Sequence, residues 1–190
     1  MKKLLLFPLL FFVCAVAQAQ WNHLQSGDLL FVSDTSGMGQ AVKESTGQYT
    51  HVAMVEREGD SLFIIDATQK RGVARRPIEN SFAHKMPVDI YRCAIPFDTA
   101  AVVARAKSLI GKPYDNAFLP DNDAYYCSEL IQVAYDTFFH SAPMNWRDKE
   151  GNLPDYWKKH FEKLGMPVPE RVPGTNPTDL SRSPLLRKLQ

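Results

Sequence analysis

Two apolar runs on either side of a short turn constrain the fold of this chain more than any other feature. The runs THVAMVERE and SLFIIDAT, residues 50–58 and 61–68, are rich in β-branched and aliphatic residues and flank Glu58-Gly59. This pattern predicts a β-hairpin with Glu58-Gly59 as its two-residue turn. The core is therefore expected to contain an antiparallel sheet.

The other apolar segments extend this prediction to a mixed fold. SGDLLFV (26–32) and PVDIYRCAI (87–95) read as further strands, whereas 34–48, with several glycines, reads as a loop with at most a helical turn. DTAAVVARAKSLIG (98–111) has an amphipathic helical pattern that stops at a glycine. We therefore predict an α+β fold.

The N-terminus has the composition of a secretory signal peptide. Residues 1–19 begin with two lysines, continue with an apolar run over 4–16, and end with the small-x-small motif AQA before Gln20. A membrane-spanning helix needs about 20 apolar residues, so this run is too short to be one. We expect a secreted, periplasmic protein without a stable membrane span.

The mature chain, residues 20–190, is expected to be a single domain. Without the two lysines of the signal, 20 of the 22 basic residues remain, against 21 acidic ones. Such a nearly neutral chain has no basic stripe for nucleic acid. Its last part, residues 143–190, is rich in proline and aromatic residues, and we expect it to wrap around the domain, with a short helix in LPDYWKKHFEKLG.

A cysteine stands where a helix is predicted to begin. In AYYCSELIQVAYDTFF, residues 124–139, apolar residues recur at helical spacing from Ser128 onward, and Cys127 lies in the first turn. The free N–H groups and the positive end of the helix dipole favour a thiolate there. Alternatively, Cys127 is a small buried hydrophobe or forms a disulfide with Cys93. We expect it to be free.

His51 is the histidine best placed to act as a base for this thiolate. It begins a strongly apolar strand, where an imidazole is costly unless it is hydrogen-bonded. With the turn at Glu58-Gly59, His51 directly faces Asp66, and the carboxylate would orient the ring. The alternatives are a core histidine or a simple ion pair, and a register slip of one residue would turn Asp66 to the other face.

Other chemistries that use such residues lack their sequence patterns. There is no HExxH, no CxxC and no pair of histidines at helical spacing, so the sequence predicts no metal site. A glycine-rich phosphate loop and the GxSxG serine elbow are absent too. We expect no cofactor.

Four short motifs together resemble one known family. GDLLFV and HVAMV (27–32 and 51–55) resemble the GDLvff…HvgiY block of NlpC-type papain-like cysteine peptidases. GKPYDNAFLPDNDAYYCSELI (111–131) resembles the GxPYxxGG…DCSGLv block, which comes first in the usual members and second here. That order is typical of the circularly permuted branch, often called YiiX-like. The resemblance covers residues 26–135 and implies a small antiparallel, barrel-like sheet packed on the cysteine-bearing helix.

The resemblance also implies a mechanism and a set of catalytic residues. Cys127 matches the nucleophile and His51 the base, while Asp66 falls where a third, orienting residue lies. Tyr114 matches a tyrosine whose hydroxyl helps to hold the oxyanion, although by itself it reads as a loop aromatic after a proline. The implied reaction is acyl transfer to water through a thioester on the cysteine, without a cofactor.

Departures from the family pattern bear on the substrate. DNAF (115–118) replaces the family's Gly-Gly, and Glu129 stands where glycine is usual. The Glu129 carboxylate predicts an altered pocket floor. We expect a cell-wall peptide as the partner and substrate, cut at an amide bond; the alternatives are a lipid-like acyl-amide and a non-catalytic binding protein with a vestigial triad. A tail (143–190) packed beside Cys127 would favour acyl chains, and a tail on the far side would favour peptides.

Overall fold

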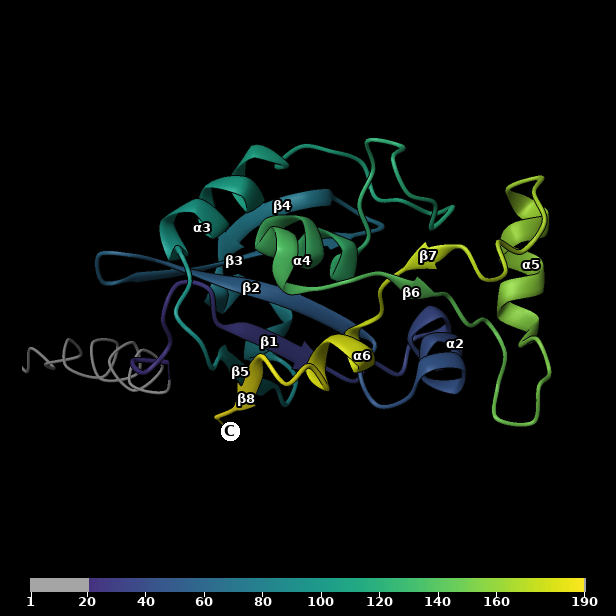
Figure 1. Ribbon diagram of the computed structural model, residues 1–190, viewed down its shortest axis with the longest axis horizontal. Coiled ribbons are helices and arrows are strands. Elements are labelled where there is room, and N and C mark those ends of the chain that lie inside the picture. The colour runs from purple at the N-terminus through teal and green to yellow at the C-terminus, as the bar shows by residue number, and fades with distance from the viewer. Residues whose placement is uncertain (1–20, 190) are drawn as a thin grey trace, which may run out of the picture.

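A six-stranded antiparallel sheet is the main feature of the computed structural model, which describes residues 21–189 (Figure 1). The predicted signal peptide, residues 1–19, lies outside the described residues. The strand order is β4-β3-β2-β1-β5-β8. The strands are β1 (Leu29–Val32), β2 (His51–Glu58), β3 (Ser61–Thr68), β4 (Gly72–Pro77), β5 (Asp89–Cys93) and β8 (Leu186–Lys188). With the helices on it, this sheet confirms the predicted α+β class.

The predicted hairpin is present, but its register differs by two residues. Glu58 pairs with Ser61, so the turn is Gly59-Asp60 and not Glu58-Gly59. Gly59 has a φ of 59°, which suits the first position of a II′ turn and places the glycine there. A shift of two residues keeps every side chain on its face, because side chains alternate with a period of two. Asp66 therefore lies diagonal to His51 on the same face, and the predicted direct pairing is wrong.

Each face of the sheet carries its own apolar core. Helices α3 (Thr99–Ser108) and α4 (Cys127–Tyr135) cover one face, and α4 packs on both β2 and β3. The other face packs against the N-terminal segment and the short 3₁₀ turns η1 (Ile78–Asn80) and η2 (Phe82–His84). Asp98 caps α3 by accepting the Ala101 N–H at 3.0 Å. This packing fixes α4 against the strand that begins with His51.

A ten-residue helix, α2 (Gly37–Thr46), occupies the segment expected to be mainly a loop. Its glycines give it a low helix propensity, which explains the wrong prediction. The helix begins at a cap, because the Ser36 hydroxyl accepts the Gly39 N–H at 3.2 Å. It also packs against α5, so tertiary contacts stabilise it.

The described part of the tail, residues 143–189, combines short helices and strands with irregular segments. The predicted short helix is present as α5 (Asp155–Lys163), which lies near α2 beyond one end of the main sheet (Figure 1). Two short strands, β6 (Ala142–Pro143) and β7 (Pro173–Gly174), pair with each other. After α6 (Pro177–Ser181), the chain returns to the main sheet, where β8 pairs with β5. Within residues 21–189, no helix has the length and apolar character needed to cross a membrane.

Candidate active site

Cys127 is the first residue of α4, as the sequence predicted. It is 5% exposed and lines a well-formed cavity. Both Cys127 and Cys93 are free thiols. Cys93 lies within β5 and is not among the residues that line this cavity. The structure therefore leaves Cys127 as the thiol that faces a space able to hold a substrate.

Glu129 stabilises the start of this helix and does not form the floor of the cavity. Its carboxylate accepts the Tyr126 N–H at 3.4 Å, which is a capping-box contact. Burial raises the pKa of this carboxyl to about 8, and the negative charge of Asp115 adds to the effect. Glu129 does not line the cavity, so the predicted contribution of its carboxylate to the pocket floor is wrong. The capping contact turns the side chain back toward its own helix terminus.

His51 and Asp66 form the polar pair behind Cys127. Nε2 of His51 lies 2.9 Å from Oδ2 of Asp66, whose side chain is 0% exposed. Phe82 packs edge-on against the imidazole at 5.1 Å between ring centroids. Because Nε2 is bonded to the carboxylate, Nδ1 is the ring nitrogen left to exchange a proton with the thiol.

The surroundings of His51 favour the imidazolium. Burial lowers the pKa of the ring, but hydrogen bonding to Asp66 and the neighbouring Cys127 outweigh burial and raise it to about 10. Burial acts on Asp66 in the opposite sense, yet hydrogen bonding to His51 and the charge of Arg76 keep the pKa of Asp66 below its usual range. The site can thus hold a proton on His51 at neutral pH, which is the state that accompanies a thiolate.

Tyr114, the fourth residue implied by the family resemblance, also lines the cavity. Its hydroxyl donates to Sδ of Met38 at 3.9 Å, a long contact typical of a weak acceptor. Burial raises the pKa of the phenol, and the proximity of Cys127 raises it further. The hydroxyl therefore stays protonated and able to donate at neutral pH.

Arg76 is a charged neighbour of this group that the sequence reasoning missed. Its Nη2 lies 2.6 Å from Oδ2 of Asp66. Arg76 pairs directly with Ile64 of β3, and paired residues point to the same face of the sheet. Asp66 is two residues after Ile64 and points to that face as well. The sequence GVARRP follows SLFIIDAT after a short turn, which indicates a second hairpin. Pairing its two strands would have placed Arg76 near Asp66.

The tail forms one part of the cavity wall. The cavity has a volume of about 500 Å³. Helix α2 and the tail both contribute to its apolar lining, with Met38, Val42, Met144, Trp146 and Trp157. The charged and polar residues at the cavity include Arg71, Arg76, Asn80 and Lys85. The tail thus packs beside Cys127 and not on the far side of the domain.

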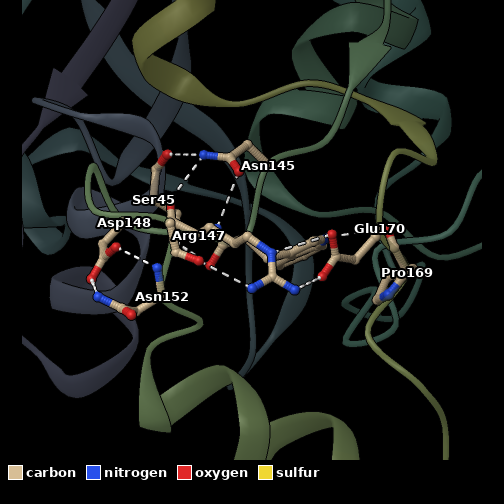
Figure 2. A network of polar contacts seen from close by, with 9 residues as sticks. Ser45, Asn145, Arg147, Asp148, Asn152, Pro169 and Glu170 are labelled. Atoms are coloured by element: carbon tan, nitrogen blue, oxygen red, sulfur yellow. Dashed lines mark hydrogen bonds and ion pairs between the residues drawn. The ribbon is translucent and has the colours of Figure 1, made fainter.

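A network of polar contacts fixes the tail to α2 (Figure 2). The Asn145 amide donates to the Ser45 carbonyl at 2.9 Å, and the Ser45 hydroxyl donates to the Trp146 carbonyl at 2.9 Å. On the other side, the Trp146 indole donates to the Pro169 carbonyl at 3.0 Å. Arg147 pairs with Glu170 at 2.5 Å. These contacts link residues 145–147 to α2 on one side and to residues 169–170 on the other.

No group of three or more His, Cys, Asp or Glu side chains within residues 21–189 is arranged to hold a metal ion. The residues gathered at the cavity are instead those of cysteine acyl-transfer chemistry. They supply a thiol at a helix N-terminus, an imidazole bonded to a buried carboxylate, and a phenolic hydroxyl.

Comparisons with known proteins identify relatives of this chain. Residues 23–190 match the family described as permuted papain-like amidase enzyme, YaeF/YiiX, C92 family. The Escherichia coli K12 protein YiiX is 29% identical over 139 residues, which are 70% of this chain and 66% of that protein. A crystal structure described as the metalloprotein yiiX from Escherichia coli O157:H7 superposes with a TM-score of 0.74 at 22% identity. That likeness covers 87% of this chain and 96% of the other, and it shows the fold alone.

Proposed function

Since the chain belongs to the family of permuted papain-like amidases, we propose that it is a cysteine hydrolase that cleaves an amide bond through a thioester on Cys127. One observation carries this proposal: the Asp66–His51 pair lies next to a thiol at a helix N-terminus, at the wall of a cavity. A vestigial site has no physical need for a buried carboxylate bonded to a histidine beside a thiol. The arrangement therefore favours catalysis over simple binding.

In the proposed reaction, His51 takes the proton of Cys127, and the thiolate attacks the carbonyl carbon of the amide. His51 then gives this proton to the leaving amine, and a thioester remains on Cys127. Water, deprotonated by the same imidazole, attacks the thioester and releases the acid. Asp66 orients the ring and stabilises its positive charge throughout.

The negative oxygen of the tetrahedral intermediates needs hydrogen-bond donors. We assign this role to the Cys127 N–H, which lies in the first turn of α4, and to the Tyr114 hydroxyl. Because the contact of this hydroxyl with Met38 is weak, turning toward a substrate oxygen costs little. Each donor of this kind is worth about 3 kcal/mol in the transition state.

The wall of the cavity favours an acyl-amide as the substrate. Aromatic and methionine side chains from the tail and α2 line the same cavity as Cys127, and apolar walls of this kind suit an acyl chain. An acyl chain would lie along Trp146 and Trp157, with its carbonyl at the thiol.

A cell-wall peptide is the second candidate, and a different part of the cavity supports it. Arg71, Asn80 and Lys85 give one side of the cavity a polar and cationic character that suits the carboxylates of such peptides. The sequence of residues 1–19 supports secretion to the periplasm, where these peptides occur. Both candidates use the same cysteine chemistry.

A competition experiment distinguishes the two substrates. Purified protein is given soluble muropeptides and a micellar N-dodecanoyl amide together, with Cys127→Ala as the control. We expect release of dodecanoate by the wild type, intact muropeptides, and neither reaction in the variant. Cleaved muropeptides beside an intact acyl-amide would support the cell-wall candidate and contradict the acyl-chain proposal.

A further inference from the structure

Two cationic side chains bind the same oxygen of Asp66. Nε2 of His51 lies 2.9 Å from Oδ2, and Nη2 of Arg76 lies 2.6 Å from it. The Asp66 side chain is 0% exposed and that of Arg76 is 13% exposed, so water screens these contacts little. The carboxylate is thus held from β2 on one side and from β4 on the other.

The orientation of Asp66 depends on these two contacts. Within residues 21–189, Oδ1 of Asp66 has no hydrogen-bond partner, so the carboxylate is held only through Oδ2. A fully buried carboxylate is costly to ionise unless charges and hydrogen bonds compensate for the lost water. The contact with His51 compensates fully only while the ring is protonated, whereas the guanidinium is charged at every working pH.

We propose that Arg76 is a positioning residue that keeps Asp66 ionised and keeps its Oδ2 directed at His51 during turnover. The proposal rests on the proposed function, because it assigns Arg76 a role in the same Asp66–His51–Cys127 group. In the catalytic cycle the imidazole loses its proton to the leaving amine and stays neutral until it deprotonates the water that attacks the thioester. Arg76 remains charged at that step and holds the carboxylate in place for the next proton transfer.

The groups that face the Asp66 carboxylate come from several elements. β2 contributes His51, β4 contributes Arg76, and α4 contributes Cys127 beyond the imidazole. The η2 turn contributes the uncharged ring of Phe82, and Lys85 follows at the cavity wall. Hydrogen bonding to His51 and the charge of Arg76 are accordingly the causes that lower the pKa of Asp66 against the effect of burial.

Removal of the arginine charge should therefore make Asp66 easier to protonate. In Arg76→Gln, the pH at which the Asp66 carboxyl titrates is expected to rise by about one unit or more. The acid limb of the pH profile of kcat/KM should shift to higher pH by the same amount. The fold decrease in kcat should exceed the fold increase in KM. Arg76→Lys keeps the charge and should stay close to the wild type. The measurements are ¹³C NMR of the Asp66 carboxyl and kinetics on the amide substrate.

Arg75→Gln is the matched control, since Arg75 is the neighbouring residue of β4 but pairs with Glu56 and Glu58 on the other face. This variant should leave the titration of Asp66 unchanged. An unchanged titration of Asp66 in Arg76→Gln, or an equal rise in Arg75→Gln, would overturn the proposal. The NMR titration needs no turnover, so a failure of the proposed amidase activity is seen separately, as an inactive wild type.

Discussion

Replacing His51 with alanine is expected to lower kcat/KM for amide hydrolysis by about 10³-fold or more, with the fold intact. A positioned general base is worth about 10² to 10⁴ in rate, and His51 serves as base toward Cys127 and as acid toward the leaving amine. The His51 side chain is only 18% exposed, but it stands at the first residue of β2, so its removal leaves the strand ladder in place. Kinetics with circular dichroism check both parts of this prediction.

The companion variant Asp66→Asn is expected to retain more activity than His51→Ala. The carboxylate orients the ring and supports its charge but does not move the reacting proton. Loss of the carboxylate should also lower the pKa of His51 from about 10, because the hydrogen bond with Asp66 raises it. His140→Ala is the control, since this exposed histidine does not line the cavity of Cys127. Full activity in His51→Ala would contradict the assignment of the base.

Replacing Trp157 with alanine is expected to cost about 3 to 5 kcal/mol of unfolding free energy. Trp157 is 1% exposed and packs edge-on against Trp146 at 4.8 Å between ring centroids. Its indole N–H donates to the Ser45 hydroxyl at 3.1 Å, which links α5 to α2. The substitution leaves a void in the small core that Trp157 forms with Phe118, Trp146 and Phe161, and it opens the cavity wall. Urea unfolding followed by fluorescence measures the loss.

Lys159→Ala, two positions along the same helix, is the control for this substitution. The lysine is exposed, so its replacement should change stability by no more than about 0.5 kcal/mol. Under the acyl-amide proposal, Trp157→Ala should also raise KM for long acyl chains more than for short ones. A loss of stability no larger than that of Lys159→Ala would contradict the packing of the tail on α2.

The hairpin shows how far sequence reasoning can go. The apolar runs predicted both strands and the shared face of His51 and Asp66, because side-chain alternation has a period of two. The turn was misplaced because Gly59 can form a two-residue loop either with Glu58 or with Asp60. The backbone conformation of the glycine decides between them. The error of two residues left the face unchanged, whereas an error of one residue would have separated the pair.

Other parts of the site depend on contacts that are distant in sequence. Helix α2 has poor helix propensity and forms against α5, over a hundred residues away. The tail could be recognised as apolar and proline-rich, but its position beside Cys127 depends on contacts such as those between Ser45 and Trp146. Comparison with the family pattern predicted that Glu129 would lie in the cavity. Its actual role as a helix cap depends on the local backbone, which such a pattern does not describe.

The thioester on Cys127 is the central claim, and mass spectrometry of the protein quenched in acid during turnover tests it most directly. With the N-dodecanoyl amide, the peptide that contains Cys127 should gain the mass of one dodecanoyl group. The peptide that contains Cys93 should stay unmodified, and Cys127→Ala should neither gain the mass nor release the acid. Continued hydrolysis by Cys127→Ala, or an acyl group found on Cys93 instead, would contradict the account.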